Sequence, residues 1–153
     1  MRRKDREIKR FEEIVEVLKR CDTVRLGLMG KAYPYVVPLS FGYEVNGEKL
    51  VLWVHGAGAG EKHALIEECD RVCVEADLFF GYQETPQGIT TLYESVIGLG
   101  KIGKVTGNEA RQGLDLILKH AGYEGYAYDE RALSMTTVYR ITLETVTGKR
   151  NRL

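Results

Sequence analysis

Hydrophobic residues near the start of the chain recur at helical spacing, and the pattern then changes to strict alternation. Within residues 5–20 the apolar side chains fall on one face of a helix, and charged residues occupy the other positions. The apolar face consists of Ile8, Phe11, Ile14, Val15 and Leu18. From Thr23 the period becomes two, which predicts strands over residues 23–29 and 33–43 joined by a turn at residues 30–32. We therefore expect an amphipathic helix followed by a sheet.

The middle of the chain continues as hairpins with one short helix. Asn46-Gly47 predicts a type I′ turn between strands over residues 41–45 and 49–54, because both residues tolerate a positive φ. A helix over residues 60–69 and a strand over residues 71–79 follow. Residues 82–88, which include Pro86, have the composition of a polar loop.

The last third of the sequence predicts two long strands around a helix. Residues 91–105 predict a strand, and Gly98, Gly100 and Gly103 predict bends or β-bulges within it. A helix capped by Asn108 extends to His120 and stops at Gly122, and residues 136–147 alternate as a final strand. These elements predict an α+β fold: a six- to seven-stranded antiparallel barrel with three peripheral helices, formed by residues 1–153 as one domain.

Composition narrows the classes of function. Lysine and arginine together number 22, as do aspartate and glutamate, so no summed positive field is available to attract nucleic acid. Basic residues gather only near the two ends of the chain, where they could hold an acidic partner or simply be solvated. Residues 50–60, an uncharged apolar and glycine-rich stretch, are too few to cross a bilayer. Three cysteines and a charged N-terminal segment are typical of a cytoplasmic protein.

Residues 50–66 carry the strongest chemical signal: a buried strand, a glycine loop and the start of a helix. Such a loop lets backbone N–H groups converge, and the helix dipole adds a positive end, so the segment predicts a phosphate site that includes Gly58, Gly60 and Lys62. The spacing matches neither a P-loop, since Glu61 separates Gly60 from Lys62, nor the dinucleotide fingerprint. An ordinary strand-to-helix turn is the alternative interpretation.

Several blocks, taken together and in order, resemble one family. They are residues 1–8, Pro34-Tyr35-Val36-Val37-Pro38-Leu39 with the following Ser-Phe-Gly-Tyr, His55-Gly56-Ala57, residues 93–98 and residues 147–150. The chain resembles the nitroimidazole-resistance proteins of the pyridoxamine 5′-phosphate oxidase-like superfamily along almost its whole length. The resemblance implies a split β-barrel that binds flavin mononucleotide (FMN), and a homodimer with two flavin sites at the subunit interface.

The resemblance also implies roles for individual residues. The flavin ring would lie along Val36, Val37, Pro38, Leu39 and Ser40, its phosphate at the loop before Lys62, and Ser95 near ring or phosphate. His55 would lie beside the flavin and the substrate, where it could deliver a proton or only form a hydrogen bond. Pro38 could equally mark a plain barrel edge, and Ser95 could bond only to backbone. No histidine–cysteine spacing predicts a metal site.

The function expected from these features is that of an FMN-dependent oxidoreductase. Flavin would take electrons from a reduced nicotinamide and pass them to a small-molecule substrate such as a nitroaromatic compound, or the enzyme would resemble pyridoxamine 5′-phosphate oxidase. The alternative is a non-catalytic protein of the same fold that binds or stores flavin, deazaflavin or haem.

Overall fold

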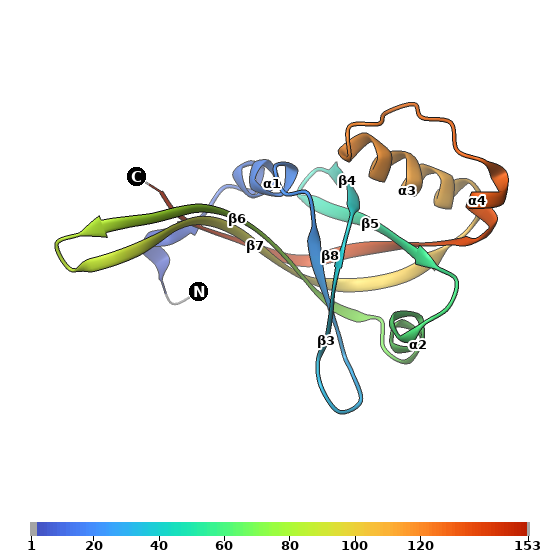
Figure 1. Ribbon diagram of the computed structural model, residues 1–153, viewed down its shortest axis with the longest axis horizontal. Coiled ribbons are helices and arrows are strands. Elements are labelled where there is room, and N and C mark those ends of the chain that lie inside the picture. The colour runs from blue at the N-terminus through green and yellow to red at the C-terminus, as the bar shows by residue number, and fades with distance from the viewer. Residues whose placement is uncertain (1–2, 153) are drawn as a thin grey trace.

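The computed structural model describes residues 3–152 and consists mainly of one curled antiparallel sheet (Figure 1). The elements follow in the order η1 (Lys4–Arg6), β1 (Glu7–Ile8), α1 (Phe11–Lys19), β2 (Val24–Leu28), β3 (Tyr35–Leu39), β4 (Phe41–Asn46), β5 (Lys49–Ala57), α2 (Glu61–Glu68), β6 (Arg71–Thr85), β7 (Gly88–Val105), α3 (Gly107–His120), α4 (Glu130–Ser134) and β8 (Thr136–Asn151). None of the helices in this described part of the chain is long and apolar enough to span a membrane.

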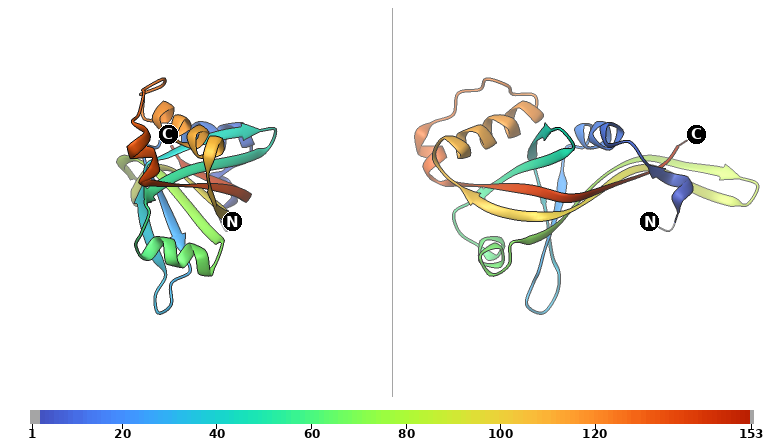
Figure 2. Two further views of the ribbon diagram at one scale, coloured as in Figure 1. Left: turned by 90° about the vertical axis from the view of Figure 1, so that its right-hand side faces the viewer. Right: turned by 180° about the vertical axis from the view of Figure 1, so that it is seen from behind.

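The order of the strands explains why the barrel is split. Along the sheet the order is β3-β2-β6-β7-β8-β5-β4, and β1 adds to β8. β3 and β4 are therefore at opposite ends of this path, yet only Ser40 separates them along the chain. The sheet must curl to bring its two ends together, and Figure 2 shows this curl from two further sides. The expected α+β split barrel is confirmed.

Two hydrophobic clusters lie on the two faces of the sheet. The larger cluster fills the inside of the curl and includes Leu26, Phe41, Leu52 and Ile141. The smaller one lies between the sheet and α3, around the buried Trp53. Helix α3 approaches closely at Gly113, where an added Cβ would lie 2.5 Å from the Trp53 ring. Alternation along β5 thus places Leu52 inside the barrel and Trp53 under the helix.

The long hairpin of β6 and β7 is the largest departure from the sequence prediction. Residues 82–88 were expected to form a polar loop, but pairing continues to Thr85 and Gly88, and only two residues remain in the turn. Figure 1 shows this hairpin as an arm that projects away from the rest of the sheet. The prediction is wrong because the arm packs on no core, so its residues need not be apolar to form a strand.

Smaller differences concern counts and caps. Residues 3–152 form eight strands and four α-helices rather than six to seven strands and three helices, because Ser40 divides one expected strand, β1 is added and α4 forms before β8. The hairpin turn is not type I′, since Gly47 alone has positive φ there. Asn108 does not cap α3, because the helix already begins at Gly107. The predicted stop at Gly122 and a bulge at Leu99/Gly100 are confirmed.

Candidate functional site

The loop between β5 and α2 has the backbone geometry of an anion site. Gly60 has a φ of 126°, in the region that favours glycine, and its carbonyl oxygen accepts the amides of His63 and Ala64 at 3.1 and 3.4 Å. Helix α2 therefore begins immediately after Gly60. The amides of Glu61 and Lys62 have no acceptor within residues 3–152, so these N–H groups are available at the positive end of the helix.

Lys62 folds back over the end of β5. Its Nζ atom lies 3.4 Å from the carbonyl oxygen of His55, and a Cβ added at Gly56 would lie 2.5 Å from the same nitrogen. Desolvation by burial lowers the pKa of Lys62, and no carboxylate of the described chain counteracts this. A partly desolvated ammonium without a negative partner is stabilised when an anion binds beside it.

His55 lies at the mouth of the same loop. It is opposite Val138 of β8, and its side chain is exposed where β5 leaves the core. Partial burial lowers the pKa of His55, and the positive charge of Lys62 lowers it further. The imidazole is therefore mainly neutral at pH 7, and it presents one N–H donor and one nitrogen acceptor to a ligand.

His63 is a functional candidate that the sequence did not reveal. Its Nδ1 atom is hydrogen-bonded to the hydroxyl of Tyr139, which is buried in β8. Burial lowers the pKa of His63, with the charge of Lys62 adding to this, and burial also raises the pKa of Tyr139. Both groups are thus neutral at pH 7, and they attach the first turn of α2 to the barrel. The two residues are 76 positions apart, so only the β5–β8 pairing brings them together.

The segment expected to hold the flavin ring forms the free edge of the sheet. Val36, Val37, Pro38 and Leu39 belong to β3, and Ser40 follows it. In the described chain β3 pairs with β2 alone, so Pro38 lies where a strand needs no further N–H donor. The prediction that Pro38 marks an edge is confirmed. Val36 and Pro38 are exposed, whereas Val37 and Leu39 pack against the barrel interior.

A hollow of about 370 Å³ lies between helix α2 and the loop that precedes β3. Residues 30–35 line one side of the hollow, and Glu61, Ala64, Leu65 and Glu68 of α2 line the other. The start of β3 and the first turn of α2 are therefore neighbours at one end of the barrel. None of the predicted cofactor residues lines this hollow, but the two predicted segments are continuous in sequence with its two walls, and their joint role stays a prediction.

Ser95 is not brought to this place. It lies on β7 opposite Lys149, whereas the β7 residue opposite Tyr139 is Lys104. Nine positions of extended strand separate Ser95 from Lys104, which corresponds to about 30 Å. Within one chain Ser95 is thus remote from Lys62, and its role stays a prediction.

The arrangement at the glycine loop fits a phosphate group. Gly58 and Gly60 provide a loop without side-chain obstruction, two first-turn amides are free to donate, and Lys62 supplies the charge. Glu61 lines the hollow on the β3 side, while Lys62 extends toward His55. A phosphate ester whose remaining part is flat and apolar would find the exposed edge of β3 nearby.

Comparisons with known proteins agree with the fold. The family model described as pyridoxamine 5′-phosphate oxidase matches residues 11–150. A search of curated proteins finds no significant match to the sequence.

Among solved structures, a proposed 5-nitroimidazole antibiotic resistance protein from Bacteroides thetaiotaomicron is similar over 94% of this chain and 85% of its own, with 25% identity and a TM-score of 0.84. The flavocytochrome Anf3 from Azotobacter vinelandii is 17% identical, with a TM-score of 0.77 over 100% of this chain and 72% of its own. A FAD- and haem-binding protein from Mycobacterium smegmatis is 15% identical, with a TM-score of 0.74 over 97% and 74%. The last two similarities concern the fold alone.

Proposed function

Because the chain belongs to the pyridoxamine 5′-phosphate oxidase family, we propose that it binds FMN and uses it to reduce a small acceptor. The observation that carries this proposal is Lys62, a partly desolvated cation without a carboxylate partner in the described chain, in the same first turn of α2 as two amides without an acceptor. That combination suits a doubly charged phosphate monoester.

Each part of the flavin has a plausible set of neighbours in this proposal. The phosphate would be held by Lys62 and the loop from Gly58 to Gly60, and the ring would lie along residues 36–40. Main-chain groups at the free edge of β3 can donate to and accept from the polar edge of the ring, and the exposed Val36 offers an apolar face. His55, at the mouth of the loop, would contact the substrate.

When bound, flavin would supply the transfer of electrons from a reduced nicotinamide to the acceptor. A nitroaromatic acceptor is suggested by the similar protein from Bacteroides thetaiotaomicron, which is described as a proposed 5-nitroimidazole resistance protein. His55 is the proposed catalytic residue. Because its imidazole is mainly neutral near pH 7, its first contribution is a hydrogen bond to the substrate, and proton delivery grows only as the pH falls.

We further propose that the protein is a homodimer. One outer face of the sheet exposes Met29, Val36 and Leu99, whose exposed fractions are 61%, 61% and 52%. These three residues line an open hollow of about 680 Å³ formed by β2, β3, β6 and β7. Contiguous apolar surface of this kind is commonly covered by a second subunit. The three cysteines are all free thiols, which suits the reducing cytoplasm.

A second candidate function is non-catalytic binding of flavin, deazaflavin or haem. It is supported by the neutral state of His55, which limits acid catalysis at pH 7, and by the fold shared with a FAD- and haem-binding protein. The two candidates differ in turnover and not in cofactor binding.

Two measurements test these proposals in sequence. The visible spectrum of the purified protein is recorded during titration with FMN, FAD, riboflavin and haem; saturable binding of FMN in preference to the others supports the cofactor, and absence of FMN binding refutes it. Oxidation of reduced nicotinamide by the FMN-loaded protein is then followed with a nitroimidazole as acceptor. Binding without turnover would favour the storage function.

A further inference from the structure

The two basic ends of the chain converge at one place, although the protein carries no net charge. β1 pairs with β8 so that Glu7 lies opposite Lys149, and this pairing brings η1 next to the last residues of β8 (Figure 1). A hollow of about 400 Å³ lies between them. It is lined by Arg3, Asp5, Arg6, Arg150, Asn151 and Arg152. Four arginines and one aspartate therefore line one small space, and Arg150 and Arg152 also line a neighbouring hollow beside α1.

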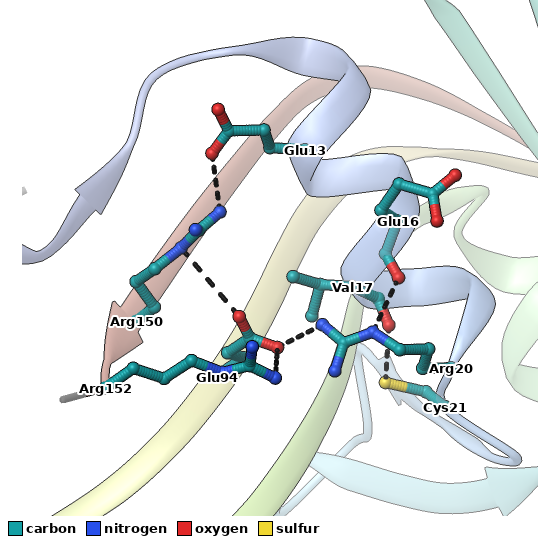
Figure 3. A network of polar contacts seen from close by, with 8 residues as sticks. All are labelled: Glu13, Glu16, Val17, Arg20, Cys21, Glu94, Arg150 and Arg152. Carbon is teal, nitrogen blue, oxygen red and sulfur yellow. Dashed lines mark hydrogen bonds and ion pairs between the residues drawn. The ribbon is translucent and has the colours of Figure 1, made fainter.

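Carboxylates outside the hollow hold these arginines in position. Glu94, only 1% exposed, accepts a hydrogen bond from Arg20 and forms an ion pair with Arg152 at 2.9 Å, and its other oxygen is 3.8 Å from Nε of Arg150 (Figure 3). Glu13 of α1 binds Arg150 at 2.6 Å. Both glutamates approach from the side of α1, where they line a separate hollow with Arg20.

The other residues that line the hollow make different contacts. Arg3 binds Asp5 through two hydrogen bonds of 2.6 and 2.8 Å, and this interaction lowers the pKa of Asp5 to about 2. The guanidinium of Arg152 also lies 4.6 Å from the centre of the Phe80 ring. Arg6 forms no ion pair with any carboxylate of residues 3–152, so its guanidinium is available to a ligand.

Positive charge exceeds negative charge in this region. Four arginines line the hollow, and the carboxylates that contact them are Asp5, Glu13 and Glu94, of which Glu94 also binds Arg20 of the neighbouring hollow. The positive charge also affects the phenol group of Tyr93. Burial alone would raise the pKa of Tyr93, but Lys149 and Arg6 lower it below its usual value. Each arginine uses only part of its five donors in the contacts above, so several N–H groups are left for an oxyanion.

We propose that this hollow, the arginine pocket, binds a small ligand that carries several phosphate groups. Guanidinium groups match phosphate oxygens in geometry and retain their charge at any physiological pH. The volume lies within the range of small-molecule sites, about 300–1,000 Å³. A nucleic acid is less suited, because it needs an extended basic surface and the chain as a whole is neutral. The ligand is either a free inorganic oligophosphate or the oligophosphate part of a nucleotide.

The arginine pocket is separate from the glycine loop. Arg150 lies opposite Glu94 near the far end of β8, whereas Thr136 at the start of β8 lies opposite Ala57 beside the loop. Fourteen positions of strand separate the two, about 46 Å when extended. Within one chain the arginine pocket therefore lies far from the glycine loop, and the Arg6→Gln and Lys62→Ala variants distinguish failure of this proposal from failure of the flavin proposal.

The test is calorimetric titration of the purified protein, in the form in which it is isolated, with inorganic tripolyphosphate. We expect saturable binding that weakens as salt is raised and that falls about 10-fold or more in Arg6→Gln and in Arg152→Gln, since each loses a charged hydrogen bond. Arg140→Gln is the matched control: Arg140 lies on the same strand, is about as exposed as Arg152, and is held by Glu109 at 2.5 Å. The Arg140→Gln variant should bind tripolyphosphate with the same affinity as the wild type.

Further titrations show where the ligand binds and whether it is a free oligophosphate or a nucleotide. Lys62→Ala should leave unchanged the part of tripolyphosphate binding that Arg6→Gln and Arg152→Gln weaken, and complete loss of binding in Lys62→Ala would overturn the proposal by placing the anion at the glycine loop. ATP that binds more tightly than tripolyphosphate would support a nucleotide, and equal or weaker binding of ATP would support the inorganic ligand. Much tighter binding of a single-stranded oligonucleotide, or no saturable binding of tripolyphosphate by the wild type, would refute a small-ligand site. Arg6→Gln keeps the test valid if Arg152→Gln does not fold, because Arg6 makes no ion pair with the buried Glu94.

Discussion

Removal of the Lys62 ammonium is the sharpest perturbation of the proposed flavin site. Lys62 is only partly exposed, and its Nζ atom has a single protein acceptor, the His55 carbonyl oxygen at 3.4 Å. A hydrogen bond to a charged group contributes about 1.5–3 kcal/mol. For this half-buried position we take about 2 kcal/mol, which corresponds to an affinity change of about 30-fold. Lys62→Ala should therefore raise the dissociation constant for FMN by roughly that factor.

The assay is a titration followed by flavin fluorescence, performed in parallel with FMN and with riboflavin. Riboflavin lacks the phosphate, so its affinity should change by less than about 2-fold if Lys62 acts on the phosphate alone. Lys31→Ala serves as a control, because Lys31 is an exposed lysine that is held by Glu68 at 3.1 Å on the adjacent loop. Equal losses for FMN and riboflavin, or an unchanged FMN affinity in Lys62→Ala, would refute the assignment of the phosphate to the glycine loop.

Three further predictions concern stability and assembly. Glu94→Gln should lower the free energy of unfolding in urea by about 2–3 kcal/mol, because the buried carboxylate holds three half-exposed guanidinium groups. Folding lowers the pKa of His63 below its usual 6.5, so the unfolded state binds more protons than the folded state just below that pH. The free energy of unfolding should therefore be highest above about pH 6.5 and fall as the pH decreases. The fall should be shallower in His63→Gln. Leu99→Glu should convert the proposed dimer to a monomer in light scattering, since Leu99 is 52% exposed on the apolar face.

Controls for these predictions come from the same chain. Glu109→Gln removes an exposed partner of Arg140 and should change stability by less than about 1 kcal/mol, so an equal loss in Glu94→Gln would contradict the role of burial. Identical pH profiles for wild type and His63→Gln would show that His63 is not the responsible group. Val45→Glu changes an exposed residue of β4, and a monomer produced by this variant as well would argue against a specific interface.

Local pattern was sufficient to predict most elements of the fold. The helical spacing of Ile14 and Leu18 and the alternation in β8 follow from burial of one face, so they can be identified without tertiary information. The arm of β6 and β7 could not be predicted in the same way, because its strands are stabilised by pairing with each other and its side chains remain largely exposed.

The candidate site was only partly accessible from the sequence. Gly60 and Lys62 belong to one continuous motif, so their proximity is a local property. The contact of His63 with Tyr139 and that of Glu94 with Arg20 join residues 76 and 74 positions apart, and each requires the register of the finished sheet. A register shift of one residue would turn Tyr139 and Glu94 to the opposite face and abolish both contacts.

The position of Ser95 connects the dimer proposal with the flavin proposal. Ser95 lies about 30 Å along β7 from Lys104, which is opposite Tyr139, the residue that contacts α2, so we do not expect one chain to place Ser95 and Lys62 on a single flavin. A two-fold axis that pairs the apolar faces of two copies can bring the Ser95 end of one copy beside the glycine loop of the other. If Ser95 contributes to the cofactor site, Leu99→Glu should weaken FMN binding together with dimerisation, and Ser95→Ala should weaken it in the dimer alone. A monomeric Leu99→Glu protein that binds FMN with unchanged affinity would confine the site to Lys62, His55 and the edge of β3, and would exclude Ser95.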